Sequence, residues 1–336
     1  MESKPLVGAT MGDPSGIGPE VLVKAFPTAR EHADLLVVGD ASVMREAVAL
    51  CDSDLTVRTV PDPESAPAAE GDLPVLAVTD LGDIEHGTVT ADYGAASLRY
   101  VERAIDLATA GRIDAIATAP INKQATKLAG SEHAGHTGLL AAATDTETYS
   151  MLLVEDSLRV THVSTHVSLR EAIERVTTES VLDTIELTGE ALAELGVGSP
   201  TIAVAGLNPH ASDGGLLGDE DDAEIRPAIE RARAAGIDAQ GPESPDTVFR
   251  RAARGAFDAV VAMYHDQGHI PIKMLGVDGN AAVGGVNVTI GLPIVRTSVD
   301  HGTAFDIAGE GVASEASMVD AVRVAAEIAR YRAADR

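Results

Sequence analysis

Short apolar runs alternate with longer segments of helical period along the whole chain, and this alternation constrains the fold most. The predicted strands are Leu6–Thr10, Leu35–Gly39, Ile113–Ala117, Met151–Val154, Val160–Ser164, Thr201–Ala205, Phe257–Met263 and Val286–Ile290. The predicted helices are Gly18–Phe26, Ser42–Leu50, Ala95–Ala110, Ser180–Leu195, Asp221–Ala235 and Glu315–Ala333. Several strands are apolar on both faces, which is typical of a sheet covered by helices on each side. The sequence therefore predicts an α/β protein.

The charge balance limits the kinds of partner. The 336 residues include 52 Asp and Glu against 25 Lys and Arg, for a formal net charge of −27. Nucleic acids and anionic membranes require a basic face, so we expect neither as a partner. No apolar stretch is long enough to span a membrane, and the N-terminal residues lack the pattern of a signal peptide. We expect a soluble, cytoplasmic protein of two domains, or one large α/β unit with a deep cleft.

Lysine is rare, and cysteine is rarer still. The lysines are Lys4, Lys24, Lys123, Lys127 and Lys273. Acid-rich, lysine-poor surfaces stay soluble when salt screens their charges, which favours a halophilic source over an ordinary acidic cytosolic protein with skewed composition. Cys51 is the only cysteine, so it cannot form an intrachain disulfide, and we expect a buried structural thiol in a reducing compartment.

A glycine-rich loop, MGDPSGIGPE at residues 11–20, follows the first predicted strand. Gly16 and Gly18 permit a tight turn from strand to helix, and Pro19 suits the first helical turn. One interpretation is a dinucleotide fingerprint with Asp40 as the acid that binds the ribose. The fingerprint needs Gly or Ala where Val21 stands, so we expect a loop shaped for another site.

Three histidines each follow the C-terminal end of a predicted strand: His166, His210 and His265. Open α/β sheets place their active sites at that edge, so the three imidazoles could ligate a divalent metal and leave positions open for substrate. Asp213 and Asp266 could be further ligands or could orient the imidazoles. The alternative is that each histidine only forms hydrogen bonds in its own loop. His162, in the same run as His166, is predicted as a packed or exposed strand residue.

A second group of residues is suited to an anion. His136 and Thr137 precede a probable helix, where free amides and the helix dipole favour phosphate. Lys273, Asn287 and Arg296 lie in a stretch that is otherwise apolar or rich in glycine. Lys273 could instead be a helix lysine whose stem packs on apolar surface. Arg296 follows a run that reads as buried, so we expect it to meet a carboxylate or a phosphate.

The segment HGTAFDIAGEG, residues 301–311, has glycines at 302, 309 and 311 around Asp306. Glycines at this density indicate a loop that a ligand approaches closely. Taken alone, the loop predicts contact with a nucleotide or with substrate.

These segments together resemble a known family. The resemblance rests on MGDPSGIGPE, APINK (119–123), GHTG, STHVSL, GLNPHASDGG, GPESPDT, YHDQGHIPIK and GVNVTIGLPIVRTSVDHGTAFDIAG. From about Leu6 to the final helix the chain resembles the 4-hydroxythreonine-4-phosphate dehydrogenase family, including its 4-phospho-D-threonate 3-dehydrogenase branch. The loop HGTAFDIAG is similar to the cofactor loop of the isocitrate and isopropylmalate dehydrogenase superfamily.

The resemblance implies a fold and an assembly. It implies two α/β domains that flank a cleft, as in isocitrate and isopropylmalate dehydrogenases, and not a Rossmann fold. We expect residues 1–125 and 286–336 to form the first domain. Residues 126–285 are expected to form the second, with the metal ligands and the dimer contacts. It also implies a homodimer whose active sites draw on both subunits.

The resemblance also assigns roles to residues. It implies that His166, His210 and His265 bind a divalent metal (Zn, Mg, Co or Mn), some of them across the dimer. It implies that substrate is bound by His136, Thr137, Lys273, Asn287 and Arg296. Asp246 matches an acidic residue near the substrate, and the general base is Lys273, Asp246 or a metal-bound water. NAD is expected against His301, Gly302, Thr303 and Asp306. The stretch Leu275–Gly285 is longer than the family pattern.

The activity implied is an NAD-dependent oxidation of a phosphorylated 3-hydroxy acid, followed by decarboxylation of the β-keto acid. The expected substrate is 4-phosphohydroxy-L-threonine, an intermediate of pyridoxine biosynthesis. The alternative is 4-phospho-D-threonate or 4-phospho-D-erythronate, which gives dihydroxyacetone phosphate. More distant alternatives are a phosphate-acyltransferase relative and a non-catalytic protein that binds a phosphorylated metabolite.

Overall fold

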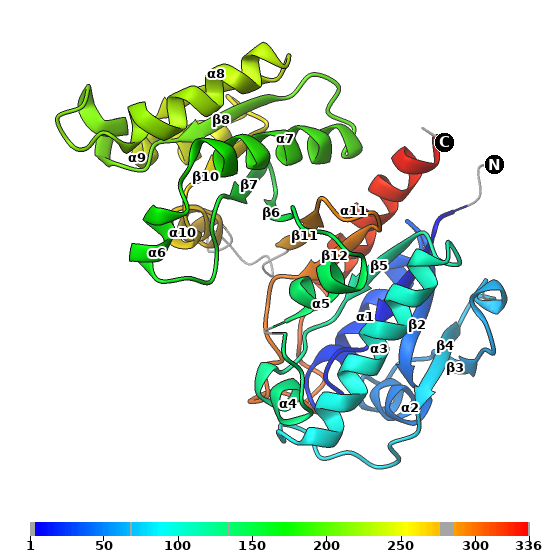
Figure 1. Cartoon of the computed structure of the whole chain (residues 1–336). Helices are drawn as coiled ribbons and strands as arrows, with labels where there is room; N and C mark the ends of the chain where they lie inside the picture. Colours follow the sequence, from blue (N-terminus) through cyan, green and yellow to red (C-terminus); the bar gives the residue numbers. More distant parts are fainter. Residues whose placement is uncertain (1–3, 68, 134, 276–284, 335–336) are drawn as a thin grey trace. The chain divides into compact units, whose positions relative to one another are not determined.

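The structure is a computed structural model that describes residues 4–67, 69–133, 135–275 and 285–334 (Figure 1). The chain divides into two compact units, Met1–Glu147 with Leu292–Arg336, and Thr148–Gly291. The boundaries expected from the sequence were 125/126 and 285/286. Each unit is a sheet covered by helices, so the predicted α/β class is confirmed. In the described part of the chain, no helix has both the length and the apolar character needed to span a membrane.

The first unit contains a parallel sheet in the order β3-β4-β2-β1-β5-β12. Its strands are β1 (Leu6–Thr10), β2 (Asp34–Asp40), β3 (Thr56–Thr59), β4 (Asp72–Thr79), β5 (Ala115–Thr118) and β12 (Arg296–Val299). Every residue of β5 and β12 is buried, and so is all of β1 except its first residue. The predicted burial on both faces is therefore found in β1 and β5, and β12, which was not predicted, shares it.

The helices of the first unit are α1 (Gly18–Ala29), α2 (Ala41–Leu50), α3 (Ala91–Thr109), α4 (Lys123–Leu128), α5 (His136–Ala143) and α11 (Ala316–Ala334). A short helical turn, η1 (Pro63–Ser65), joins β3 to β4. Helix α1 packs against α2 and α11, and α11 also contacts β1, β5 and β12. Helix α3, drawn in cyan in Figure 1, packs on α4 and on β1, β2 and β5.

Asp40 ends β2 and caps the N-terminus of α2. One of its carboxylate oxygens accepts hydrogen bonds from the backbone amides of Ser42 and Val43, at 2.8 and 3.2 Å. The other accepts from the Thr79 hydroxyl and the Leu81 amide, both at 2.8 Å. Burial raises the pKa of Asp40, but the hydrogen bond from the Ser42 hydroxyl, together with those from Thr79, Leu81 and Val43, outweighs burial and holds the pKa below its usual value. Both oxygens are occupied by the protein, so Asp40 is not a ribose-binding acid.

Cys51 ends α2 and is half-buried, which is less burial than the sequence predicts. Its Sγ lies 3.8 Å from the carbonyl oxygen of Glu20. Burial and the nearby Glu20 carboxylate raise the pKa of the thiol, so it stays protonated at neutral pH.

The second unit contains a mixed sheet in the order β11-β6-β7-β10-β8-β9. Its strands are β6 (Ser150–Glu155), β7 (Leu158–His162), β8 (Thr201–Ala205), β9 (Asp238–Glu243), β10 (Ala259–Ala262) and β11 (Val286–Ile290). Strand β6 is antiparallel to β11 and β7, and the remaining pairs are parallel. Its helices are α6 (Leu169–Glu174), α7 (Thr178–Glu194), α8 (Arg226–Ala234), α9 (Pro245–Ala253) and α10 (His265–Leu275), with short turns η2 (Pro209–Asp213) and η3 (Asp221–Ile225).

The core of the second unit has two layers, one on each face of its sheet. Ile202 and Val204 of β8 belong to the layer that also contains apolar residues of α7 and α8. Ala203 and Ala205, the alternate residues, belong to the layer that contains Val248 of α9 and other residues of α9 and α10. Because successive side chains of a strand point to opposite faces, both faces of β8 are buried.

Candidate active site

Strand β7 and helix α10 bring four imidazole rings together in the second unit. His162 ends β7, and His166 follows four residues later. His265 and His269 lie in the first turns of α10, which follows β10, the parallel neighbour of β7. The ring centroids of His166 and His265 are 5.5 Å apart, and those of His162 and His269 are 4.7 Å apart. The structure thus brings together two of the three predicted metal ligands.

The His166–His265 pair fits a shared metal ion. Two imidazoles on one tetrahedral ion, with metal–nitrogen distances of ~2.1 Å, have ring centres roughly 5 Å apart. Asp266 Oδ1 lies 2.6 Å from His265 Nδ1, so the carboxylate orients the ring and leaves Nε2 for a ligand. His269 does not match this geometry, because its ring is stacked on His265 at 3.7 Å and 10°.

His210 stands on a left-handed turn of the η2 segment. His210, Ala211, Ser212 and Asp213 have φ angles of 55°, 55°, 64° and 45°, a backbone that costs L-residues roughly 1–2 kcal/mol each. The turn is held by buried Asp221, whose carboxylate accepts from the Ser212 hydroxyl at 2.7 Å. Strain of this kind concentrates at functional sites, because the surrounding structure must maintain it.

The three predicted metal ligands do not form one group in a single chain. Among the described residues, no set of three or more His, Cys, Asp or Glu side chains is arranged to hold a metal ion. His210 is exposed and acts electrostatically on Asp246, which lies in the first turn of α9. The Ser244 hydroxyl donates to Asp246 Oδ1 at 2.6 Å. This hydrogen bond, with a smaller effect of His210, lowers the pKa of Asp246, which is therefore a carboxylate at neutral pH.

His162 is packed, one of the two outcomes the sequence left open. It is 2% exposed, and a Cβ on Gly268 of α10 would lie 2.3 Å from its Nε2. Neither ring nitrogen has a hydrogen-bond partner among the described residues. Burial, and then the charges of His269 and His265, lower the pKa of His162 to about 3. His269 was not predicted as a site residue, although its spacing of four from His265 places both on one helix face.

Two predicted substrate ligands also lie in the second unit. Lys273 is exposed near the end of α10. Asn287 lies in β11, and its Nδ2 is 2.7 Å from the sulfur of Met151 in β6. Of the long stretch Leu275–Gly285, residues 276–284 lie outside the described residues.

The first unit holds a cationic group built from β12 and α5. Arg296 begins β12, is 2% exposed, and donates from Nη2 to the Thr118 hydroxyl at 2.7 Å. Burial lowers the pKa of Arg296 to about 9, so it remains charged at neutral pH. His136 and Thr137 are the first residues of α5. Burial, and then the charges of Arg296 and Lys123, lower the pKa of His136 well below its usual value. A buried cation beside a neutral imidazole and helix amides is suited to an anion.

The predicted cofactor loop is held by the glycine-rich loop at residues 11–20. The Ile17 amide donates to the Thr303 carbonyl at 3.1 Å, and Glu20 Oε1 accepts from the Gly309 amide at 3.2 Å. A Cβ on Gly16 would lie 3.0 Å from both Cβ and the carbonyl oxygen of Thr303. The two loops, which lie nearly 300 residues apart in the sequence, are therefore packed backbone against backbone.

The exposed part of the cofactor loop carries the predicted ligands. Gly302 and Asp306 are exposed, and Thr303 is half-buried. His301 Nδ1 donates to the Gly302 carbonyl at 3.0 Å, and its Nε2 is shielded from solvent with no partner among the described side chains and backbone. No atom lies within 4 Å of the Cβ position of Gly302, so a ligand has access to the backbone there.

Comparison with known proteins agrees with the motifs. Residues 31–325 match the family described as pyridoxal phosphate biosynthetic protein PdxA. A relative from Cupriavidus necator named D-threonate 4-phosphate dehydrogenase is 47% identical, over 98% of this chain and 98% of its own. A relative from Desulforapulum autotrophicum named 4-hydroxythreonine-4-phosphate dehydrogenase is 44% identical, over 100% of this chain and 98% of its own.

A solved structure gives the same result for the fold. The crystal structure of 4-hydroxythreonine-4-phosphate dehydrogenase from Klebsiella pneumoniae has a TM-score of 0.85 and 42% identity, over 97% of this chain and 99% of that one. These similarities extend over nearly the whole chain and confirm the resemblance and the enzyme class inferred from the motifs. The chain therefore belongs to the pyridoxal phosphate biosynthetic protein PdxA family, and it is a dehydrogenase.

Proposed function

We propose that the protein is an NAD-dependent, metal-dependent dehydrogenase that oxidises 4-phosphohydroxy-L-threonine and decarboxylates the resulting β-keto acid. The observation that carries the proposal is the buried Arg296 beside His136, a cationic site of the kind that a phosphorylated substrate requires. Family membership supplies the dehydrogenase chemistry.

The substrate is proposed to bind through His136, Thr137, Lys273, Asn287 and Arg296. Arg296 offers a fixed guanidinium, which matches the oxygens of a phosphate or carboxylate. The amides at the start of α5 add donors without adding charge. Fixing both ends of a small substrate orients its carbinol carbon, which is a large part of catalysis in hydride transfer.

NAD is proposed to bind against His301, Gly302, Thr303 and Asp306. When bound, NAD accepts the hydride that leaves the carbinol carbon of the substrate. The open backbone at Gly302 and the shielded His301 Nε2 fit a polar ligand at this loop. Asp306 is exposed and can accept hydrogen bonds from ligand hydroxyl groups.

A divalent metal is proposed to bind His166, His210 and His265. When bound, the metal supplies a Lewis acid that favours loss of the hydroxyl proton and stabilises the negative charge that develops as carbon dioxide leaves. Three imidazoles suit Zn or Co better than Mg, which prefers oxygen ligands. Asp246 and Lys273 are the proposed proton-transfer residues, and Asp246 is already ionised at neutral pH.

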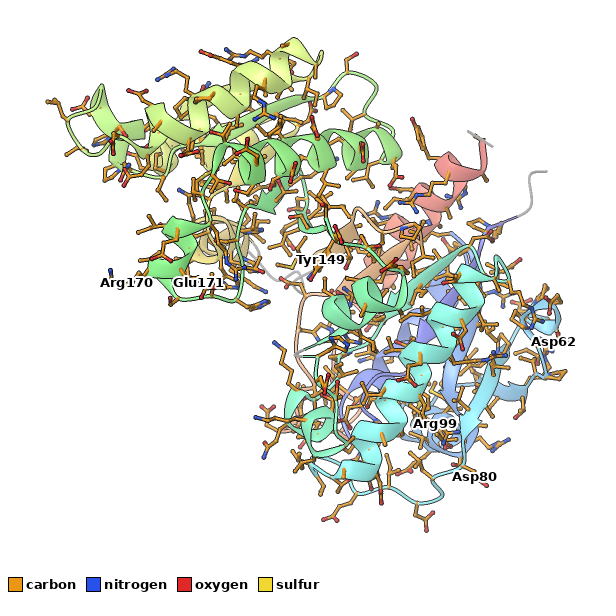
Figure 2. All side chains as sticks on the ribbon, in the orientation of Figure 1. Asp62, Asp80, Arg99, Tyr149, Arg170 and Glu171 are labelled. Carbon is orange, nitrogen blue, oxygen red and sulfur yellow. The ribbon has the colours of Figure 1, made fainter. Side chains whose placement is uncertain are left out.

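We propose that the metal site is completed in a homodimer. One chain pairs His166 with His265 but forms no group of three donors within its described residues, so a second copy would supply the third imidazole. The helices next to the cluster expose the large apolar side chains such an interface needs, namely Leu169, Ile173, Ile270 and Met274. Figure 2 labels Arg170 and Glu171 on α6, the charged neighbours of Leu169.

The substrate proposal has one close competitor. The relatives named for D-threonate 4-phosphate and for 4-hydroxythreonine 4-phosphate are 47% and 44% identical to this chain, so similarity does not separate them. The two substrates differ by an amine or a hydroxyl on one carbon, which a single polar contact could distinguish. A phosphate acyltransferase is not favoured, because both relatives are named dehydrogenases.

The test is a turnover assay in molar salt with NAD and a divalent metal. 4-Phosphohydroxy-L-threonine and D-threonate 4-phosphate are offered separately, and reduced cofactor and carbon dioxide are measured. We expect turnover of the first substrate, loss of activity on chelation, and recovery with Zn or Co. Turnover of D-threonate 4-phosphate alone would overturn the substrate assignment. No reduction of NAD by either substrate, in folded and metal-loaded protein, would overturn the proposed activity.

A further inference from the structure

Lys123 lies beside the start of α5, although no role was predicted for it. It is the first residue of α4 and ends the segment APINK. Its Cε lies 3.8 Å from the position that a Cβ on Gly135 would occupy. Gly135 directly precedes His136, so the end of the lysine stem comes close to the backbone next to the predicted anion ligand.

The backbone of Lys123 is held in place from two sides. Asn122 caps α4, and its Oδ1 accepts from the Gln124 and Ala125 amides at 2.9 and 3.0 Å. A Cβ on Gly94 of α3 would lie 2.0 Å from the Ala125 carbonyl oxygen, so the two helices touch through their backbones. The start of α4 is therefore fixed against α3, and the exposed Lys123 side chain extends from this fixed backbone.

The residues near His136 supply less positive charge than a phosphate group carries negative charge, and Lys123 can supply more. A phosphate monoester carries a charge of roughly −1.5 to −2 at pH 7. His136 is neutral because burial and the neighbouring cations hold its pKa far down, so Arg296 is the one charged side chain among the predicted substrate ligands of the first unit. Lys123 is the other cation that acts on His136, which places its charge in the same region.

We propose that Lys123 is a further anion-binding residue of this site and supplies, with Arg296, the second positive charge for a phosphate group. The proposal rests on the proposed function only in identifying the anion as the substrate phosphate. The flexible Lys123 side chain can move its positive charge toward the phosphate group, whereas the positive charge of buried Arg296 is fixed in place.

The experiment compares Lys123→Met with Lys127→Met, a matched loss of an exposed lysine on the same short helix. Binding of inorganic phosphate is measured by calorimetry, without turnover, and KM and kcat are measured for the phosphorylated substrate and NAD. We expect Lys123→Met to weaken phosphate binding and raise KM for substrate about tenfold, the loss of one charge-assisted hydrogen bond. In Lys123→Met the KM for NAD should stay within about twofold of the parent value. In Lys127→Met phosphate binding and both KM values should also stay within about twofold of the parent. Lys123→Arg should recover most of the phosphate binding.

The outcomes separate this proposal from the proposed function. Equal phosphate binding by the parent and Lys123→Met would overturn the role of Lys123 while leaving the dehydrogenase proposal intact. Equal weakening by both Met variants would also overturn it, because only the overall charge would then matter. Loss of phosphate binding in Lys123→Met from a protein that turns over neither substrate would uphold the anion site and overturn the activity.

Discussion

Arg296 and His162 are both buried, and burial acts on them in the same direction because each is charged when protonated. The pKa of Arg296 falls to about 9, so it keeps its charge at neutral pH, and that of His162 falls to about 3, so it does not. Arg296 is thus a buried positive charge that a bound anion can neutralise. His162 is a neutral residue that packs within the group of histidine rings.

His162 should make the protein acid-sensitive. The unfolded chain takes up a proton on His162 as the pH falls through 6.5, whereas the folded chain does so only near 3. The free energy of unfolding should therefore decrease between these values. The free energy of unfolding is measured with urea at about pH 7 and about pH 4.5, after metal has been removed with a chelator. We expect it to decrease less in His162→Leu than in the parent protein. An equal loss in both proteins would show that His162 is not responsible.

The rule about strand ends accounts for one pair of the three predicted histidines, because His210 also follows a parallel strand of this sheet and is not grouped with the other two. His166 and His265 follow parallel neighbours, so their proximity could be foreseen from sequence. The environment of His162 could not, because it depends on the close approach of Gly268 from a helix about a hundred residues away. The position of Lys123 depends in the same way on contact between α3 and α4.

At the scale of elements, three loops of the first unit form one assembly. Residues 11–20 contact the predicted cofactor loop and also a third loop, which contains Gly87 and Thr88. The Ser15 carbonyl accepts from the Gly87 amide at 2.8 Å, and the Ser15 hydroxyl donates to the Thr88 carbonyl at 2.8 Å. A Cβ on Gly87 would lie 2.9 Å from the Phe305 carbonyl oxygen. The glycine-rich loop therefore supports the cofactor loop, a role for which its glycines are needed at points of backbone contact.

Gly16→Ala should weaken NAD binding while phosphate binding stays unchanged. The added methyl would lie 3.0 Å from Thr303 and 3.3 Å from the Phe305 ring, so the cofactor loop must shift. Crowding of this kind costs about 1–3 kcal/mol. Calorimetric titration with NAD and with inorganic phosphate measures the two effects separately. Gly198→Ala, where no atom lies within 4 Å, is the control. An unchanged NAD affinity would contradict the supporting role of this loop.

The predicted strands are all present, but four further strands were not predicted. The unpredicted strands are β3, β4, β9 and β12. Strand β9 reads DAQGPE and β3 reads TVRT, both at sheet edges, where polar residues and Gly-Pro hide the strand pattern. The helix predicted over Asp221–Ala235 begins as the separate turn η3, because buried Asp221 bonds to the neighbouring loop. The edge argument covers β3 and β9 only, because β4 lies between two strands and every residue of β12 is buried.

At the scale of the molecule, the net charge of −27 should make stability depend on salt. Screening lengths shrink from ~10 Å at 0.1 M salt to ~3 Å at 1 M, which reduces the repulsion among carboxylates. We expect the urea midpoint of unfolding to rise steadily between about 0.1 and 1 M KCl. Sucrose, which is uncharged, is the control for solvent effects. A midpoint that falls or stays constant with KCl would contradict the halophilic interpretation.

The proposed dimer predicts that assembly and metal binding are lost together. Ile270 is 60% exposed on α10, the helix that carries His265. We expect Ile270→Glu to give a monomer by sedimentation velocity and to lower the metal content, because a charge cannot be buried in an apolar interface without a partner. Val312→Glu, at an equally exposed position of the first unit, should leave both unchanged. A monomeric parent protein, or a variant that stays dimeric with full metal content, would refute the shared site.

The turn that carries His210 also has a consequence for chirality. Its four consecutive left-handed residues form a short segment of mirror-image helix within a chain of L-amino acids. Ala211 has φ 55° and ψ 57°, which lie in the left-handed helical region that D-alanine favours. Along this turn the backbone is one that L-amino acids disfavour. A semisynthetic protein with D-alanine at position 211 would hold its histidine with less strain than the natural chain does.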